Sequence, residues 1–68
     1  MELSARNKIK GKIKDIKLGE IMAKISIEIA DGTIMSSIIT VDSAKELKLK
    51  VGNEVYAIVK STEVMIGK

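Results

Sequence analysis

The sequence contains no cysteine, histidine, proline, phenylalanine or tryptophan, and its only aromatic residue is Tyr56. Without cysteine there is no disulfide framework, and without cysteine or histidine the ordinary ligands of zinc, haem and iron–sulfur centres are missing. The same absences remove the usual general base and the thiol nucleophile of enzymes. The composition therefore predicts a protein that is not an enzyme and that holds no bare metal cation.

The small size of the chain limits how much hydrophobic core can stabilise the fold. Its 68 residues suffice for a single domain, which we expect to span residues 1–68. A domain of about 60 residues buries only about 60% of the surface that its unfolded chain exposes, so its core alone is marginal. With disulfides and metals excluded, self-association is the expected additional source of stability.

The balance of charge favours an anionic ligand without requiring one. Twelve Lys and Arg residues against nine Asp and Glu residues leave a formal net charge of +3. No apolar run approaches the roughly 18 residues of a membrane span, and the first residues lack the apolar core of a secretion signal. We therefore expect a cytoplasmic protein without a membrane partner.

Isoleucine and valine dominate the apolar residues, which favours strands over helices. The alternation of apolar and polar residues over positions 21–29 predicts a half-buried strand, with Ile21, Ala23, Ile25, Ile27 and Ile29 on one face. This strand leads into Asp31-Gly32, a dipeptide suited to a tight turn, and positions 33–41 are predicted to return as its hairpin partner.

In the segment before that hairpin, positions 8–18, the alternation of apolar and polar residues shifts by one residue. Its apolar positions move from Ile9 and Ile13 to Ile16 and Leu18, an odd step that one regular strand cannot accommodate. The slip predicts a bulge near Lys14-Asp15, of the kind that curls a sheet toward a barrel.

After the hairpin the pattern predicts a short helix and two further strands. Asp42 or Ser43 is the expected N-cap, and Glu46 stands at capping-box spacing from Ser43. The last strands are expected at positions 54–60 and 64–66. Three strands, a short helix and two strands are the layout of a mainly β, five-stranded, OB-type barrel.

Three polar groups stand at the ends of the predicted strands. They are Ser4-Ala5-Arg6-Asn7, Thr40 with Ser43, and Lys60-Ser61-Thr62. Each has a purely structural explanation as solvated surface, helix cap or turn. The carboxylates are scattered among strand faces and turns, and those near the helix start are favoured there by its dipole, so they form no catalytic or cation-binding set.

Taken together, the segments that contain these groups, residues 4–7, 39–43 and 60–65, resemble the molbindins, also called molybdenum-pterin-binding proteins, a Mop family built on a TOBE/OB-type domain. The resemblance covers essentially the whole chain, including the Asp-Gly hairpin and the spacing between the clusters. It implies a molybdate or tungstate binding and storage protein that needs no organic cofactor. It also implies strand-exchanged dimers, three of which form a homohexamer.

The resemblance further implies which residues bind the oxyanion. Ser4, Arg6, Lys60 and Ser61 would come from one subunit, together with backbone N–H groups near Ala5, and Thr40 and Ser43 would come from a neighbour. The chemistry of these side chains agrees, because Arg6 and Lys60 supply two positive charges and the hydroxyls supply further hydrogen-bond donors.

Two alternatives remain at this stage. A single-stranded nucleic-acid-binding OB module would use the row Lys8, Lys10, Lys12 and Lys14 to follow phosphates, but Tyr56 alone would have to stack the bases. A purely structural assembly module is the third possibility. The shortage of aromatic residues argues against nucleic acid as the partner.

Overall fold

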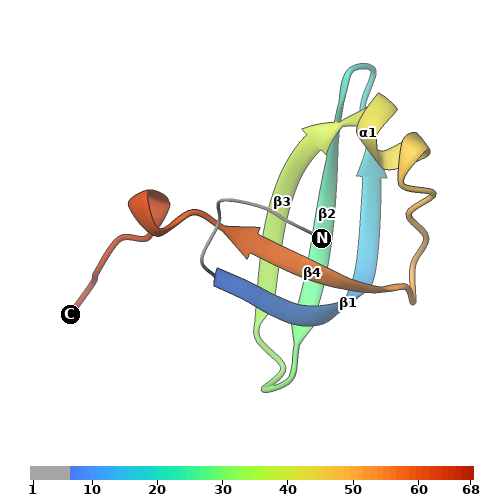
Figure 1. Ribbon diagram of the computed structural model, residues 1–68. Helices are drawn as coiled ribbons and strands as arrows, with labels where there is room; N and C mark the ends of the chain where they lie inside the picture. The colour runs from blue at the N-terminus through green and yellow to red at the C-terminus, as the bar shows by residue number, and fades with distance from the viewer. Residues whose placement is uncertain (1–6) are drawn as a thin grey trace.

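A curled antiparallel sheet forms the body of the protein in the computed structural model, which describes residues 7–68 (Figure 1). Its strands are ordered β3-β2-β1-β4. The elements follow the chain as β1 (Asn7–Leu18), β2 (Met22–Ile29), β3 (Ile34–Thr40), α1 (Val41–Glu46), β4 (Glu54–Val59) and the 3-10 turn η1 (Ser61–Glu63). The predicted mainly β class, with one short helix between the third and fourth strands, is confirmed.

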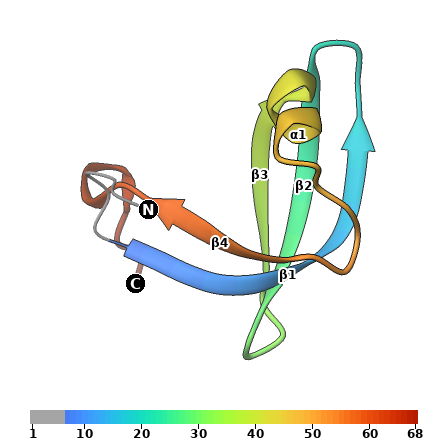
Figure 2. The same cartoon turned by 45° about the vertical axis from the view of Figure 1, so that its right-hand side comes forward.

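The long strand β1 belongs to both halves of the sheet. Its first half pairs with β4, starting at Asn7 opposite Val59, and its second half pairs with β2, ending at Leu18 opposite Ala23. The register with β2 shifts at Lys14, which confirms the predicted bulge. Because a bulge bends its strand, β1 turns from one half of the sheet to the other (Figure 2).

The turn between β2 and β3 is the predicted hairpin. Gly32 has a φ of 88°, a backbone conformation that glycine adopts without steric cost. The Asp31 carboxylate accepts a hydrogen bond from the Thr33 N–H at 2.9 Å. Hydrogen bonds from the Thr33 side chain and backbone hold the pKa of Asp31 below its ordinary value.

The core lies on the concave face of the sheet beneath α1. Its buried members within residues 7–68 are all aliphatic, namely Ile13, Ala23, Ile25, Ile27 and Ala44. The predicted inward face of β2 is therefore confirmed at positions 23, 25 and 27. It is wrong at Ile21, which is 73% exposed because it belongs to the turn that precedes β2.

The predicted helix cap needs correction. Thr40, and not Asp42 or Ser43, is the N-cap of α1, because its backbone keeps the extended conformation of β3 and its Oγ1 accepts the Ser43 N–H at 3.0 Å. Ser43 is thus the third residue inside the helix.

The predicted fifth strand is not confirmed by the single chain. Residues 64–66 belong to no ladder among residues 7–68, and Met65 and Ile66 are 91% and 92% exposed. Figure 1 shows this C-terminal segment leading away from the sheet. A strand is defined by hydrogen bonds to a neighbouring strand, and residues 64–66 pair with none of the strands among residues 7–68.

Candidate functional site

Thr40 and Ser43 lie together where β3 passes into α1. The Thr40 hydroxyl donates to Ser43 Oγ at 2.8 Å and accepts from the Ser43 N–H at 3.0 Å. The Val41 N–H donates to the Ile21 carbonyl at 2.7 Å, which ties this corner to the start of β2. Because the Thr40 hydroxyl donates its hydrogen to Ser43 Oγ, only the Ser43 hydroxyl of this pair can donate a hydrogen bond to a ligand.

Lys60 and Ser61 lie at the end of β4, where the chain enters η1. The turn is closed by a hydrogen bond from the Glu63 N–H to the Lys60 carbonyl at 2.9 Å. Both side chains are exposed, and within residues 7–68 no carboxylate lies within ion-pair distance of Lys60. Among residues 7–68, therefore, no carboxylate competes with an anion for Lys60.

Ser4, Ala5 and Arg6 lie outside the described residues. Asn7, which follows Arg6 in the sequence, pairs with Val59 and donates from its side-chain amide to the Val59 carbonyl at 3.3 Å. The β1–β4 ladder thus ends with Asn7 opposite Val59. In the sequence, Asn7 follows Arg6 and Val59 precedes Lys60.

The two described groups stand at opposite ends of β1 and do not meet within one chain. Thr40 pairs with Met22, next to the Leu18 end of β1, whereas Lys60 follows Val59, which pairs with Asn7. The 12 residues of β1 lie between the two groups. Figures 1 and 2 agree in placing η1 far from α1. A single copy therefore cannot assemble the complete predicted set.

As far as residues 7–68 show, the barrel is open between its two edge strands, β3 and β4. No ladder joins β3 to β4, and a gap of about 180 Å³ separates residues 35–37 from residues 56–59. A second, wider groove of about 550 Å³ lies at the start of β1, lined by Asn7, Lys8, Ile9, Met35, Val59 and Val64. Both openings border the end of β4 that leads to Lys60.

The lysine row of β1 is partly neutralised on the outer face of the sheet. Lys10 lies 3.5 Å from the Glu54 carboxylate and Lys14 lies 3.9 Å from that of Glu28. Tyr56 stands opposite Lys10 in the ladder and is 57% exposed. A lone ring beside two ion pairs is a poor platform for a run of stacked bases.

The described part of the chain contains no cluster of three or more potential metal-binding His, Cys, Asp or Glu side chains. None of its helices has the length and apolar character needed to cross a membrane. The polar groups at the two ends of β1 are thus the strongest candidates for a site.

Comparison with known proteins extends these observations. The family model described as TOBE domain matches residues 3–66. Molybdenum-pterin-binding protein 1 of Clostridium pasteurianum is 50% identical over 66 residues, 97% of each chain. The probable molybdenum-pterin-binding protein of Haemophilus influenzae is 46% identical over 67 residues, 98% of this chain and 97% of that one. A solved structure of a molybdate binding protein from Sporomusa ovata is similar over 100% of both chains, with a TM-score of 0.94 and 41% identity.

Proposed function

Since the chain belongs to the TOBE domain family and is a close homologue of the molybdenum-pterin-binding proteins, we propose that it binds molybdate or tungstate as an intact oxyanion. The observation that carries the proposal is whole-length similarity to such proteins, with a solved molybdate binding protein sharing the fold at a TM-score of 0.94. The role is binding and storage in the cytoplasm, without catalysis and without an organic cofactor.

The oxyanion site draws on two subunits. One subunit supplies Ser4, Arg6, Lys60, Ser61 and the backbone near Ala5, and a neighbour supplies Thr40 and Ser43. Two features support this division. The β1–β4 ladder ends beside Arg6 and Lys60 in the sequence, and the Thr40–Ser43 pair lies at the opposite end of β1.

The donors suit a tetrahedral dianion. Arg6 and Lys60 balance its two charges, and the serine and threonine hydroxyls approach from other directions. Taking a dianion out of water is costly unless both cations are present. Hydrogen bonds to charged groups contribute roughly 1.5–3 kcal/mol each, which corresponds to about tenfold or more in affinity.

Assembly into a homohexamer of three strand-exchanged dimers completes the proposal. Within residues 7–68 twelve large hydrophobic side chains are exposed, whereas the buried core consists of three isoleucines and two alanines. An apolar surface of this extent on a soluble protein marks an interaction surface. The open edges of β3 and β4 and the unpaired residues 64–66 offer the backbone groups that strand exchange requires.

Isothermal titration with molybdate tests the function. We expect saturable binding by the wild type, at least tenfold weaker binding by Arg6→Ala, and wild-type affinity in the control Lys17→Ala, which removes the same charge from the outer face of β1. Absence of binding by the wild type would refute the oxyanion function. Equal affinity in Arg6→Ala would remove only Arg6 from the site.

The nucleic-acid alternative is tested in parallel by fluorescence anisotropy with a labelled single-stranded oligonucleotide. We expect no binding at physiological salt, because the lysine row is partly paired and Tyr56 is the only ring. Tight, salt-dependent oligonucleotide binding without molybdate binding would favour the alternative.

A further inference from the structure

One side-chain hydrogen bond joins the two strand ends beside which the cations of the proposed oxyanion site stand. The Asn7 side-chain amide donates from Nδ2 to the Val59 carbonyl at 3.3 Å. Of the side-chain hydrogen bonds among residues 7–68, it alone connects two strands of the sheet. Asn7 and Val59 are also the terminal pair of the β1–β4 ladder. The bond therefore closes the end of the sheet that adjoins Arg6 and Lys60 in the sequence.

The Val59 carbonyl belongs to the peptide unit that leads into Lys60. Because a peptide unit is planar, this carbonyl oxygen, the Lys60 N–H and the Lys60 Cα move as one body. A hydrogen bond to the oxygen thus restrains the direction in which Lys60 leaves β4. Lys60 keeps an extended backbone there, with a φ of −65° and a ψ of 138°, and its side chain forms no capping hydrogen bond with η1.

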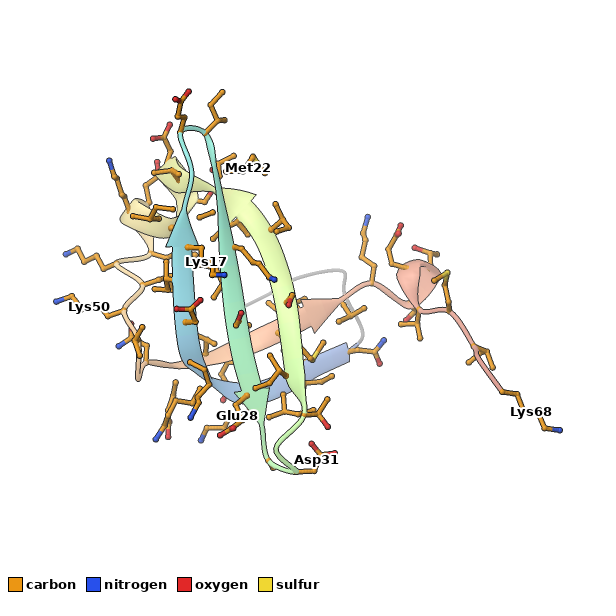
Figure 3. The ribbon with its side chains drawn as sticks, turned by 180° about the vertical axis from the view of Figure 1, so that it is seen from behind. Lys17, Met22, Glu28, Asp31, Lys50 and Lys68 are labelled. Carbon is orange, nitrogen blue, oxygen red and sulfur yellow. The ribbon has the colours of Figure 1, made fainter. Side chains whose placement is uncertain are left out.

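The chain beyond Lys60 is held by a local contact. The hydrogen bond from the Glu63 N–H to the Lys60 carbonyl, at 2.9 Å, lies within the turn itself. Figure 3 shows the chain after this turn leading away from the sheet toward Lys68. A groove of about 550 Å³ borders the end of the ladder and is lined by both Asn7 and Val59. A strand end beside an open groove separates locally at low cost in free energy, so a bond between the two strands matters there.

The side chain at position 7 is also suited to this place by its neutrality. A carbonyl oxygen can only accept, so its partner must be a donor, as the amide of Asn7 is. An aspartate could not donate, and it would place a negative charge next to Arg6 in the sequence, where it would compete with an anion for the cations. Asparagine closes the end of the ladder without neutralising a cation.

We propose that Asn7 is a positioning residue of the oxyanion site, which aligns Lys60 with the strand that continues from Arg6. This inference rests on the proposed oxyanion function. Asn7 acts through the Val59 carbonyl and does not itself contact the anion. Two cations that share one anion repel each other before it binds, and a structure that holds them in place beforehand lowers the cost of binding.

Isothermal titration of the intact protein with molybdate, and with sulfate as the smaller ion, tests the proposal. Asn7→Leu removes the donor with little change in side-chain size and should bind molybdate about threefold to tenfold more weakly than the wild type. The ratio of molybdate affinity to sulfate affinity should fall as well, because loosely placed cations discriminate less by ion size. Asn7→Gln keeps an amide donor and should bind molybdate more tightly than Asn7→Leu.

Asn53→Leu is the matched control. Asn53 Oδ1 accepts a hydrogen bond from the Lys50 N–H at 2.8 Å in the loop before β4. The variant therefore loses the same kind of bond, between a side-chain amide and the backbone, at the end of β4 remote from Lys60. It should melt at a lower temperature than the wild type and keep the wild-type affinity and selectivity.

The possible results separate this role from the function on which it rests. Absence of molybdate binding by the wild type would overturn the oxyanion function itself. Binding by the wild type with equal affinity in Asn7→Leu would overturn the positioning role alone. A loss with an unchanged ratio of the two anions, or the same loss in Asn53→Leu, would assign Asn7 a structural role only. Equal affinities of Asn7→Gln and Asn7→Leu would show that the donor is not what matters.

Discussion

At the scale of single residues, Thr40 is both the N-cap of α1 and a proposed oxyanion-site residue, whereas the sequence pattern indicated Asp42 or Ser43 as the cap. As the N-cap it satisfies the Ser43 N–H, and through the same hydroxyl it orients Ser43 Oγ at 2.8 Å. The side chain that begins α1 thus also arranges a hydroxyl proposed to bind the oxyanion. Stability and binding should therefore change together at this position.

Replacement of Thr40 by alanine should lower the free energy of unfolding by about 1 kcal/mol, the usual cost of losing a side-chain cap. Thr40→Ser keeps the hydroxyl and should stay within a few tenths of the wild type. Urea denaturation at one fixed protein concentration measures both. A wild-type midpoint for Thr40→Ala would show that the hydrogen bond does not stabilise α1.

Gly11 provides a second prediction at this scale, since it allows β2 to approach β1 closely. A methyl group added there would lie 2.5 Å from Ile27 Cγ2 and 2.9 Å from the Glu28 carbonyl oxygen, so something must shift. Gly11→Ala should destabilise the protein by about 1–3 kcal/mol, as overpacking does. Gly67→Ala is the matched control, because nothing lies within 4 Å of the added carbon. Equal thermal midpoints for the two variants would contradict the close approach.

At the scale of elements, the stability of the β2–β3 hairpin turn depends on pH through the carboxyl group of Asp31. Hydrogen bonds from the Thr33 side chain and then its backbone lower the pKa of Asp31 from 3.8. Because the folded-state pKa is lower than the unfolded one, the unfolded chain binds more protons in this range. The stabilisation that the ionised Asp31 gives the folded protein is complete above the pKa of Asp31 in the unfolded chain. It is lost as the pH falls through the pKa of Asp31 in the folded protein.

The pH titration of Asp31 by NMR should accordingly give a pKa below 3.8. Thr33→Val removes the side-chain hydrogen bond, the largest cause, and should move the pKa of Asp31 upward. In denaturation experiments the difference between the wild type and Asp31→Asn should shrink as pH falls below the pKa of Asp31. A pKa unmoved by Thr33→Val would leave the backbone N–H as the sole cause.

At the scale of the whole molecule, the proposed sharing of the site between subunits would link oxyanion binding to assembly. A ligand that binds only the assembled folded state stabilises it by mass action, by about 2.7 kcal/mol at a ligand concentration 100 times the dissociation constant. The exposed apolar side chains among residues 7–68 would give the proposed assembly a driving force of its own.

Molybdate and tungstate should therefore raise the melting temperature, and sulfate should raise it little, because a smaller ion fills the same donors poorly. Differential scanning calorimetry measures the shifts, and native mass spectrometry with and without molybdate counts subunits and bound anions. Equal shifts with all three anions would indicate general anion binding instead of a selective store.

The sequence predicted local structure well where a feature depends on neighbours along the chain. The alternation of β2, the Asp-Gly turn and the bulge at Lys14 all follow from side-chain period and backbone preference. The sequence-based strand assignments differ from the structure where contacts between residues distant in the sequence determine whether a segment joins the sheet. Ile21 continues the alternation of β2 but lies in a turn, and residues 64–66 have strand-forming side chains but pair with no strand among residues 7–68.

For the candidate site, the sequence determined the residue types, and the absence of cysteine and histidine left Arg, Lys, hydroxyl and backbone groups as the donors. Only the tertiary structure decided that Thr40 and Ser43 lie at one end of β1 and Lys60 at the other. The physical reason is that strand pairing and chain curvature, which bring distant residues together or keep them apart, depend on long-range contacts that no local pattern encodes.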